Sequence, residues 1–337
     1  MIGVPLSMLD LPLRQAGRPP AEIVRGQVDL ATRLEALGYH RVWYAEHHGS
    51  LTMADFPPGV VVSHVAAMTT TIRVGSGGVL APNHVPLSVV EQFSALEDLS
   101  PGRVDLGIGR GPGTFDETTA RALRRGGPPA TGDEYDADVA AILHLLAQRE
   151  NAVAPWLLSS SSAGAGLAAR LGLPMAFAHH ILPRNTVAAV EHYRAQFQPS
   201  RWTDTPRVMV SVATICADTD VEASRLARPA DIMQLTVLLE GRERPLPSNE
   251  EAAAHVFTAR EEDVLAEIRE HQLYGGSATV TDGLARTAAR FGADELMVVT
   301  PVYAVRDRAR SCELVAASRG ESSSSTSASR GVNQVRR

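Results

Sequence analysis

The sequence contains no lysine, so every one of its 32 Lys or Arg positions is an arginine. Without a lysine amine, Schiff-base catalysis and phosphate binding by a P-loop lysine are both excluded. Cysteine is also scarce, because Cys216 and Cys312 are the only two. Two cysteines are too few for a disulfide framework or a zinc site, and we expect both to be buried, unreactive thiols.

Aromatic residues make up only 5% of the chain, against 44% hydrophobic residues, so the core must consist mostly of Ala, Val and Leu. A net charge of -6 gives no positive surface for nucleic acid. No apolar run approaches the ~20 residues that span a bilayer, and residues 1–10 lack the features of a signal peptide. We therefore expect a cytoplasmic protein with neither nucleic acid nor a membrane as partner.

Short apolar runs alternate with longer amphipathic patterns along most of the chain. This alternation predicts a parallel sheet with helices outside it. Eight units favour a closed (β/α)8 TIM barrel over an open doubly wound sheet. The runs predicted as strands are 4–8, 41–45, 73–80, 104–108, 156–158, 175–178, 207–216 and 295–299.

Two segments depart from this alternation. Residues 218–274 are too long for a simple crossover and predict a helical insertion between strands seven and eight, placed to cover the barrel mouth. Residues 319–337 are rich in serine and have almost nothing to bury, so we expect a disordered tail. The predicted organisation is one barrel domain over residues 1–318, followed by that tail.

Five polar or glycine-rich segments each come directly after a predicted strand. In a barrel of this kind, chemistry is carried by the loops at the carboxyl ends of the strands. The five segments therefore indicate an enzyme whose site they share. They are residues 46–48 (EHH), 81–84 (APNH), 109–113 (GRGPG), 159–164 (SSSSAG) and 179–180 (HH).

Two of these segments have the chemistry of a phosphate site. The serine run at 159–164 leads into a helix, whose free N–H groups favour an anion, although an ordinary helix N-cap would also use serine. Residues 107–111 (GIGRG) match a dinucleotide fingerprint poorly, because Pro112 follows at once. Arg110 is better interpreted as a clamp on a phosphate group.

The histidines and a glycine-rich strand leave alternatives open. His47 and His48 point to opposite faces of a strand, which argues against a shared metal site and favours one of them as an acid or base. Glycines at 75, 77 and 78 weaken a central strand, so either a flat ligand or a bulge requires them. His179 and His180 line a substrate pocket or are buried core histidines.

Several of these segments together resemble the bacterial luciferase-like family of flavin-dependent monooxygenases. The resemblance covers roughly residues 4–318 and is most specific in the first hundred. The similar segments are 37–48 (LGYHRVWYAEHH), 72–84 (IRVGSGGVLAPNH), 91–110 (EQFSALEDLSPGRVDLGIGR) and 171–178 (LGLPMAFA).

The resemblance implies a (β/α)8 barrel, in agreement with the strand count. It further implies reduced FMN as cosubstrate, delivered by a separate flavin reductase, and activation of O2 as a flavin C4a-peroxide that oxygenates a small organic substrate such as an aldehyde or a secondary metabolite. His47 matches the family's catalytic histidine. We also expect a homodimer.

The remaining site residues follow from the same matches. Gly77 and Gly78 fall where the family has a cis non-prolyl peptide under the flavin ring. We expect three further histidines, His48, His84 and His179, to contact the substrate. The positions that match the family's phosphate site are Arg110, Arg121, Ser160, Ser161 and Gly164.

The chain also departs from the family in two places. Residues 55–59 (DFPPG) replace a serine-rich segment that commonly ends in Pro-Glu, and residues 126–155 form a shorter stretch than usual. Two alternatives stay open: a deazaflavin F420-dependent oxidoreductase, and a non-catalytic flavin-binding protein. The sequence Glu46-His47-His48 favours the FMN enzyme over the F420 enzyme, and the presence of His47 argues against a non-catalytic protein.

Overall fold

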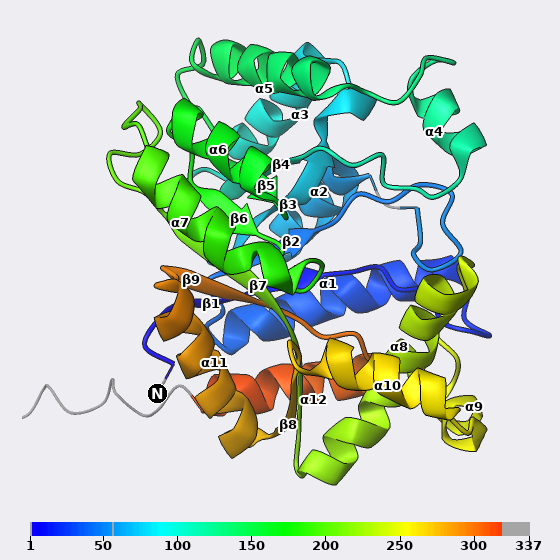
Figure 1. Ribbon diagram of the computed structural model, residues 1–337. Helices are drawn as coiled ribbons and strands as arrows, with labels where there is room; N and C mark the ends of the chain where they lie inside the picture. The colour runs from blue at the N-terminus through cyan, green and yellow to red at the C-terminus, as the bar shows by residue number, and fades with distance from the viewer. Residues whose placement is uncertain (1, 56, 319–337) are drawn as a thin grey trace, which may run out of the picture.

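Eight parallel strands close into a barrel, as the sequence predicts (Figure 1). The first strand pairs with the second and with the last, and β6 pairs with β7 to complete the ring. The barrel strands are β1 (Leu6–Asp10), β2 (Arg41–Tyr44), β3 (Arg73–Leu80), β4 (Val104–Gly109), β5 (Ala154–Ser159), β6 (Met175–Phe177), β7 (Val208–Ala217) and β9 (Glu295–Val299).

The structure is a computed structural model that describes residues 2–55 and 57–318. The tail predicted at 319–337 therefore lies outside the described residues. Within them, no helix is both long and apolar enough to cross a membrane. Both cysteines are buried and unpaired, as expected.

Helices surround the barrel and bury their apolar faces against it (Figure 1). Their ends follow local chemistry: Thr131 and Glu134 form a capping box at the start of α5, and Gly172 ends α6 in the left-handed region. The helices that cross from strand to strand are α1 (Pro20–Ala36), α2 (Pro58–Met68), α3 (Pro86–Leu99), α4 (Glu117–Leu123), α5 (Gly132–Leu146), α6 (Ser162–Leu171), α7 (Thr186–Gln196) and α11 (Ser277–Phe291), with 3-10 turns at Ala81–Asn83 and Pro183–Asn185. The last helix, α12 (Val305–Ala317), follows β9.

The predicted insertion between strands seven and eight consists of α8 (Asp220–Glu240), α9 (Asn249–Ala254) and α10 (Ala259–Arg269). A short strand that we did not predict, β8 (Leu273–Gly276), follows these helices, and among the described residues it pairs only with the carboxyl end of β7. Figure 1 shows α8, α9 and α10 gathered away from α5 and α6. The insertion contacts the loop after β1, where Gln15 pairs with Leu246, beside the barrel mouth.

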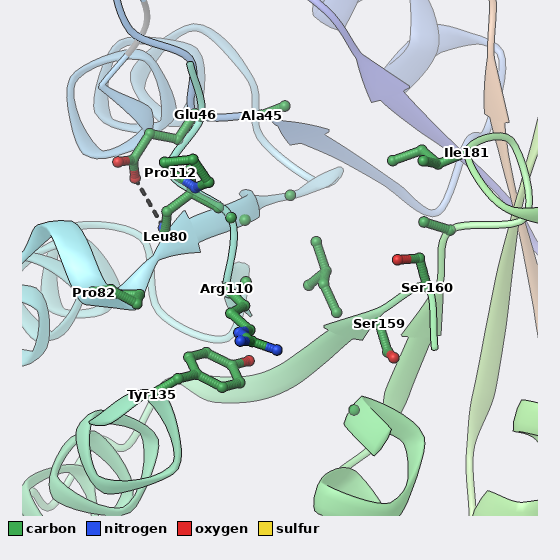
Figure 2. Close-up of a pocket in the computed structure, with 18 of the residues that line it drawn as sticks. Ala45, Glu46, Leu80, Pro82, Arg110, Pro112, Tyr135, Ser159, Ser160 and Ile181 are labelled. Carbon is green, nitrogen blue, oxygen red and sulfur yellow. Dashed lines mark hydrogen bonds between the residues drawn. The ribbon is translucent and has the colours of Figure 1, made fainter. Parts of the chain in front are cut away.

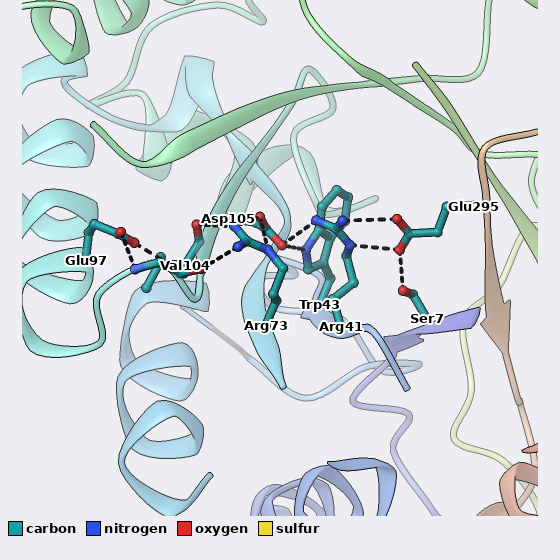
Figure 3. Close-up of polar contacts among 9 residues, drawn as sticks. Ser7, Arg41, Trp43, Arg73, Glu97, Val104, Asp105 and Glu295 are labelled. Atoms are coloured by element: carbon teal, nitrogen blue, oxygen red, sulfur yellow. Dashed lines mark hydrogen bonds and ion pairs between the residues drawn. The ribbon is translucent and has the colours of Figure 1, made fainter. Parts of the chain in front are cut away.

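A charged layer closes the amino-terminal end of the barrel (Figure 3). The guanidinium of Arg41 lies between two carboxylates, 2.7 Å from Asp105 and 2.8 Å from Glu295. Asp105 also accepts hydrogen bonds from Arg73 and from the Trp43 indole. Because these buried charges are paired at the end opposite the loops that carry chemistry, they serve stability.

Candidate functional site

A cavity of about 1000 Å³ lies at the carboxyl ends of the barrel strands. Each of the five segments singled out in the sequence contributes at least one residue to its wall, namely His47, Asn83, Arg110, Ser160 and His180. The five segments therefore meet around one cavity at the barrel mouth. This volume is at the upper end of the ~300–1,000 Å³ typical of small-molecule sites, so it has room for a cofactor and a substrate together.

One wall of the cavity carries two residues without side chains, Gly77 and Gly78 of β3. The peptide between them is cis, as predicted. A Cβ on Gly77 would lie 2.6 Å from Leu9 Cδ1, and a Cβ on Gly78 would lie 2.8 Å from the carbonyl oxygen of Gly107. At Gly78 the close atoms belong to the backbone, so no larger residue fits there, and a side chain at Gly77 would have to displace Leu9. With glycine at both positions this wall is bare and can accept a flat ring.

The opposite end of the cavity carries hydrogen-bond donors (Figure 2). Arg110, which follows β4, lies beside Tyr135 of α5, with Ser159 and Ser160 of the β5–α6 connection facing them. Among the described residues, Arg110 has no ion-pair partner and the Tyr135 hydroxyl has no hydrogen bond. A guanidinium and a hydroxyl left free in this way are suited to a phosphate group.

Tyr135 was missed by the sequence interpretation, although a signal was present. It lies four residues before Val139, a spacing that places both residues on one buried face of a helix, where its hydroxyl would require a partner. The side chain is 4% exposed, and burial, with Asp136 nearby, raises its pKa. The hydroxyl therefore keeps its proton and can donate a hydrogen bond to a ligand.

The start of α6 is organised by its own serines. The Ser161 hydroxyl accepts a hydrogen bond from the Gly164 N–H, so it serves as the helix N-cap. A Cβ on Gly164 would lie 2.5 Å from Ser159 Oγ, which explains the glycine. Ser160 has no such side-chain bond within the described residues, so its hydroxyl is left for a ligand.

Arg121 also lines the cavity, on α4, an element that the sequence interpretation did not predict. Its guanidinium lies 3.0 Å from Glu117, four residues earlier on the same helix. Both side chains are more than half exposed, so the pair is weak. Arg121 can therefore turn to a phosphate at little cost.

His47 lines the cavity directly after β2. Burial and the neighbouring His48 lower its pKa to about 4, more than nearby carboxylates raise it. The imidazole is therefore neutral near pH 7 and free to accept a proton.

Glu46 organises the loops around His47. Burial alone would raise its pKa, but hydrogen bonds from His48, His84 and the Leu80 N–H outweigh burial and lower it to about 2. Figure 2 shows the bond from the Leu80 N–H. A permanently charged carboxylate thus joins two segments at the cavity rim, residues 46–48 and residues 80–84.

The three histidines expected to contact substrate lie elsewhere. His48 and His84 bind Glu46, and His179 bonds to Thr186 and packs on Phe291. None of these three is among the described residues that line the cavity, whereas His180 is. Adjacent residues on a chain face different ways, and only the tertiary structure shows which of the pair His179 and His180 faces inward.

Known proteins resemble this chain over most of its length. The sequence profile of the luciferase-like monooxygenase family matches residues 7–295. The chain is 39% identical to YvbT of Bacillus subtilis, with 92% of this chain and 95% of that protein covered. It is 36% identical to a luciferase-like monooxygenase of Escherichia coli K12, covering 92% and 96% respectively.

Solved structures show the same fold. The crystal structure of apo-MsnO8 superposes with a TM-score of 0.87 at 35% identity, covering 94% of this chain and 98% of that one. Two more distant structures carry different cofactors. The oxygenating constituent of 3,6-diketocamphane monooxygenase from Pseudomonas putida, in complex with FMN, has a TM-score of 0.70 at 16% identity. An F420-dependent secondary alcohol dehydrogenase has a TM-score of 0.65 at 12% identity. At such identities the likeness concerns the fold alone.

Proposed function

This chain belongs to the luciferase-like monooxygenase family, and on that premise we propose that it is an FMNH2-dependent monooxygenase. It would use O2 to oxygenate a small organic substrate. The observation that carries the proposal is the division of one cavity into a bare wall at Gly77–Gly78, a donor end at Arg110 and Tyr135, and a neutral histidine, His47, which follows the strand that pairs with β3.

The residues present fit a flavin mononucleotide. Arg110, Tyr135 and Ser160 would hold the phosphate, with Arg121 and the N–H groups at the start of α6 adding to them. The bare wall would lie against the flat ring. Reduced FMN, when bound, would supply the electrons that O2 requires, and the protein would supply orientation and electrostatics.

The chain's own contribution to the reaction would come from His47 and from exclusion of water. His47 would accept and return a proton at its imidazole, a role that contributes ~10²–10⁴-fold in rate when the base is well placed. Its lowered pKa keeps the resting ring neutral and favours the return of any proton that it accepts during turnover. Leu9, Trp43, Met209 and Met297 line the floor of the cavity and would keep it dry.

The proposal also includes partners and a location that follow from the family resemblance. A separate reductase would deliver the reduced flavin, and the active form would be a homodimer in the cytoplasm. Size-exclusion chromatography with light scattering measures the oligomer directly.

Ligand binding tests the phosphate site. We expect FMN to bind more tightly than riboflavin, which lacks the phosphate. Arg110→Ala should weaken FMN binding by about 1.5–3 kcal/mol, the range for a charged hydrogen bond, and leave riboflavin unchanged. Arg149→Ala, an exposed arginine outside the cavity, is the matched control. Equal affinities of the parent for FMN and riboflavin would refute this placement, and tighter binding of F420 than of FMN would favour the F420 alternative.

Turnover tests the oxygenation. The protein would be supplied with FMN, NADH, a generic flavin reductase, ¹⁸O2 and a small-molecule extract. We expect a product that carries ¹⁸O. Reduction of an organic compound without ¹⁸O would instead indicate a hydride-transferring oxidoreductase.

A further inference from the structure

The cavity is electrostatically divided. All of its charged lining residues come from the segment 46–170, and among the described residues none comes from 171–318. The uncharged side is built by β6, β7, β9 and β1, whose contributions include Ala176, Met209, Met297 and Leu9. His180 and Ser211 are the polar side chains on this otherwise apolar side.

His180 stands opposite His47 across the barrel. His47 follows β2 and His180 follows β6, and these strands are four positions apart in the ring of eight. The proposed flavin site uses the β3, β4 and β5 side of the cavity. The space between His180 and the apolar floor is therefore left for a second molecule.

The proton positions on His180 follow from a chain of two contacts. Its Nδ1 atom lies 2.7 Å from Ser211 Oγ, and that hydroxyl lies 3.1 Å from the carbonyl oxygen of Phe177. A hydroxyl has one proton to donate. If the Ser211 hydroxyl donated this proton to Nδ1 of His180, Ser211 Oγ and the carbonyl oxygen of Phe177 would face each other at 3.1 Å with no proton between them. Both contacts are hydrogen bonds only if the Nδ1–H of His180 donates to Ser211 Oγ and the Ser211 hydroxyl donates to the carbonyl oxygen of Phe177.

This order leaves Nε2 of His180 without a proton. Within the described residues Nε2 has no hydrogen-bond partner, and His180 lines the cavity. Burial, with His179 nearby, lowers the pKa of His180 to about 4, so the imidazole stays neutral near pH 7. An acceptor on an uncharged apolar wall selects a ligand that brings its own donor.

We propose that His180, held in one tautomer by Ser211, is a substrate-binding hydrogen-bond acceptor, and that the substrate is an uncharged, mainly apolar molecule bearing a hydroxyl group. The inference rests on the proposed function, because it assigns to substrate the part of the cavity that the flavin would not use. His47 and His180 then have separate roles on opposite sides of the barrel, proton transfer and recognition.

The first test measures the tautomer itself. ¹⁵N NMR of histidine-labelled protein, with the His180 signals identified by their loss in His180→Phe, reports which ring nitrogen carries the proton. We expect a protonated Nδ1 and a bare Nε2. A proton on Nε2 would overturn the proposal, because the wall would then present a donor and select a carbonyl group.

The second test compares two probes that differ by one donor, 2-naphthol and 2-methoxynaphthalene, by calorimetry with and without FMN. We expect the parent protein to bind 2-naphthol about fivefold more tightly, the effect of one net hydrogen bond. His180→Phe should bring the ratio close to one, and Ser211→Ala should reduce it. Ser211→Thr, which keeps the hydroxyl, should restore it.

Equal affinities in the parent, or binding of neither probe, would overturn the proposal. So would a preference for 2-naphthol that survives in His180→Phe. FMN affinity, measured in parallel on the same variants, separates this inference from the proposed function. Failure of FMN to bind would refute the flavin assignment, whereas the tautomer and the preference of the flavin-free protein for 2-naphthol would still support the role of His180.

Discussion

Glu46 offers the sharpest quantitative test of the site's architecture. Its side chain is fully buried at the cavity rim and accepts hydrogen bonds from His48, His84 and the Leu80 N–H at 2.7–3.0 Å. Glu46→Gln keeps the shape of the side chain but removes the charge that these donors require.

The size of the effect follows from the pKa. Glu46 has a pKa lowered from 4.5 to about 2, and this difference corresponds to about 3 kcal/mol of unfolding free energy at neutral pH. Because the folded-state pKa is the lower one, the contribution is fully present above pH 4.5. It is lost as the pH falls from 4.5 towards 2.

Urea unfolding at pH 7 measures the loss directly. We expect Glu46→Gln to lower the unfolding free energy by about 3 kcal/mol, and the gap between variant and parent to begin to narrow below pH 4.5. Glu91→Gln, at an exposed glutamate of α3, removes the same charge and should change stability by less than ~0.5 kcal/mol. A loss at Glu46 no larger than this control would refute the reasoning that the buried carboxylate holds the rim together.

Three further predictions follow from the site and the barrel. His47→Ala should keep its affinity for FMN but form much less product per FMNH2 consumed, measured with any substrate that the parent turns over. His48→Ala should retain most turnover, and the reverse pattern would assign the catalytic role to His48. Gly78→Ala should lower the melting temperature, because its Cβ would lie 2.8 Å from the Gly107 carbonyl oxygen, and an unchanged melting temperature would contradict that steric account. Asp105→Asn should lower the unfolding free energy in urea by about 3–5 kcal/mol by leaving buried arginines short of counter-charge; a loss below ~1 kcal/mol would show that the charged layer does not stabilise the barrel.

The barrel was predictable because its strands and helices carry strong local patterns. The strands at 73–80 and 295–299 were predicted with the bounds that the structure has. The strand β8 was missed because it has four residues, two of them glycine, and pairs with a single neighbour. Helix α4 was missed because it is a short exposed helix with no buried residue, so no apolar period marks it.

The site was likewise predictable in part. The sequence alone identified the loops that meet at the barrel mouth, since chain order and the parallel sheet oblige all strand ends to face one side. It could not decide which side chains turn inward. His180 lines the cavity and His179 does not. Tyr135 comes from α5, whereas the serines that it faces lie at the end of β5 and after it. Nor could it show that Glu46 binds His84, because that contact joins residues 38 positions apart. Local pattern determines which elements form and where they begin and end, whereas the direction of a side chain and its partners depend on packing between elements that only the closed barrel brings together.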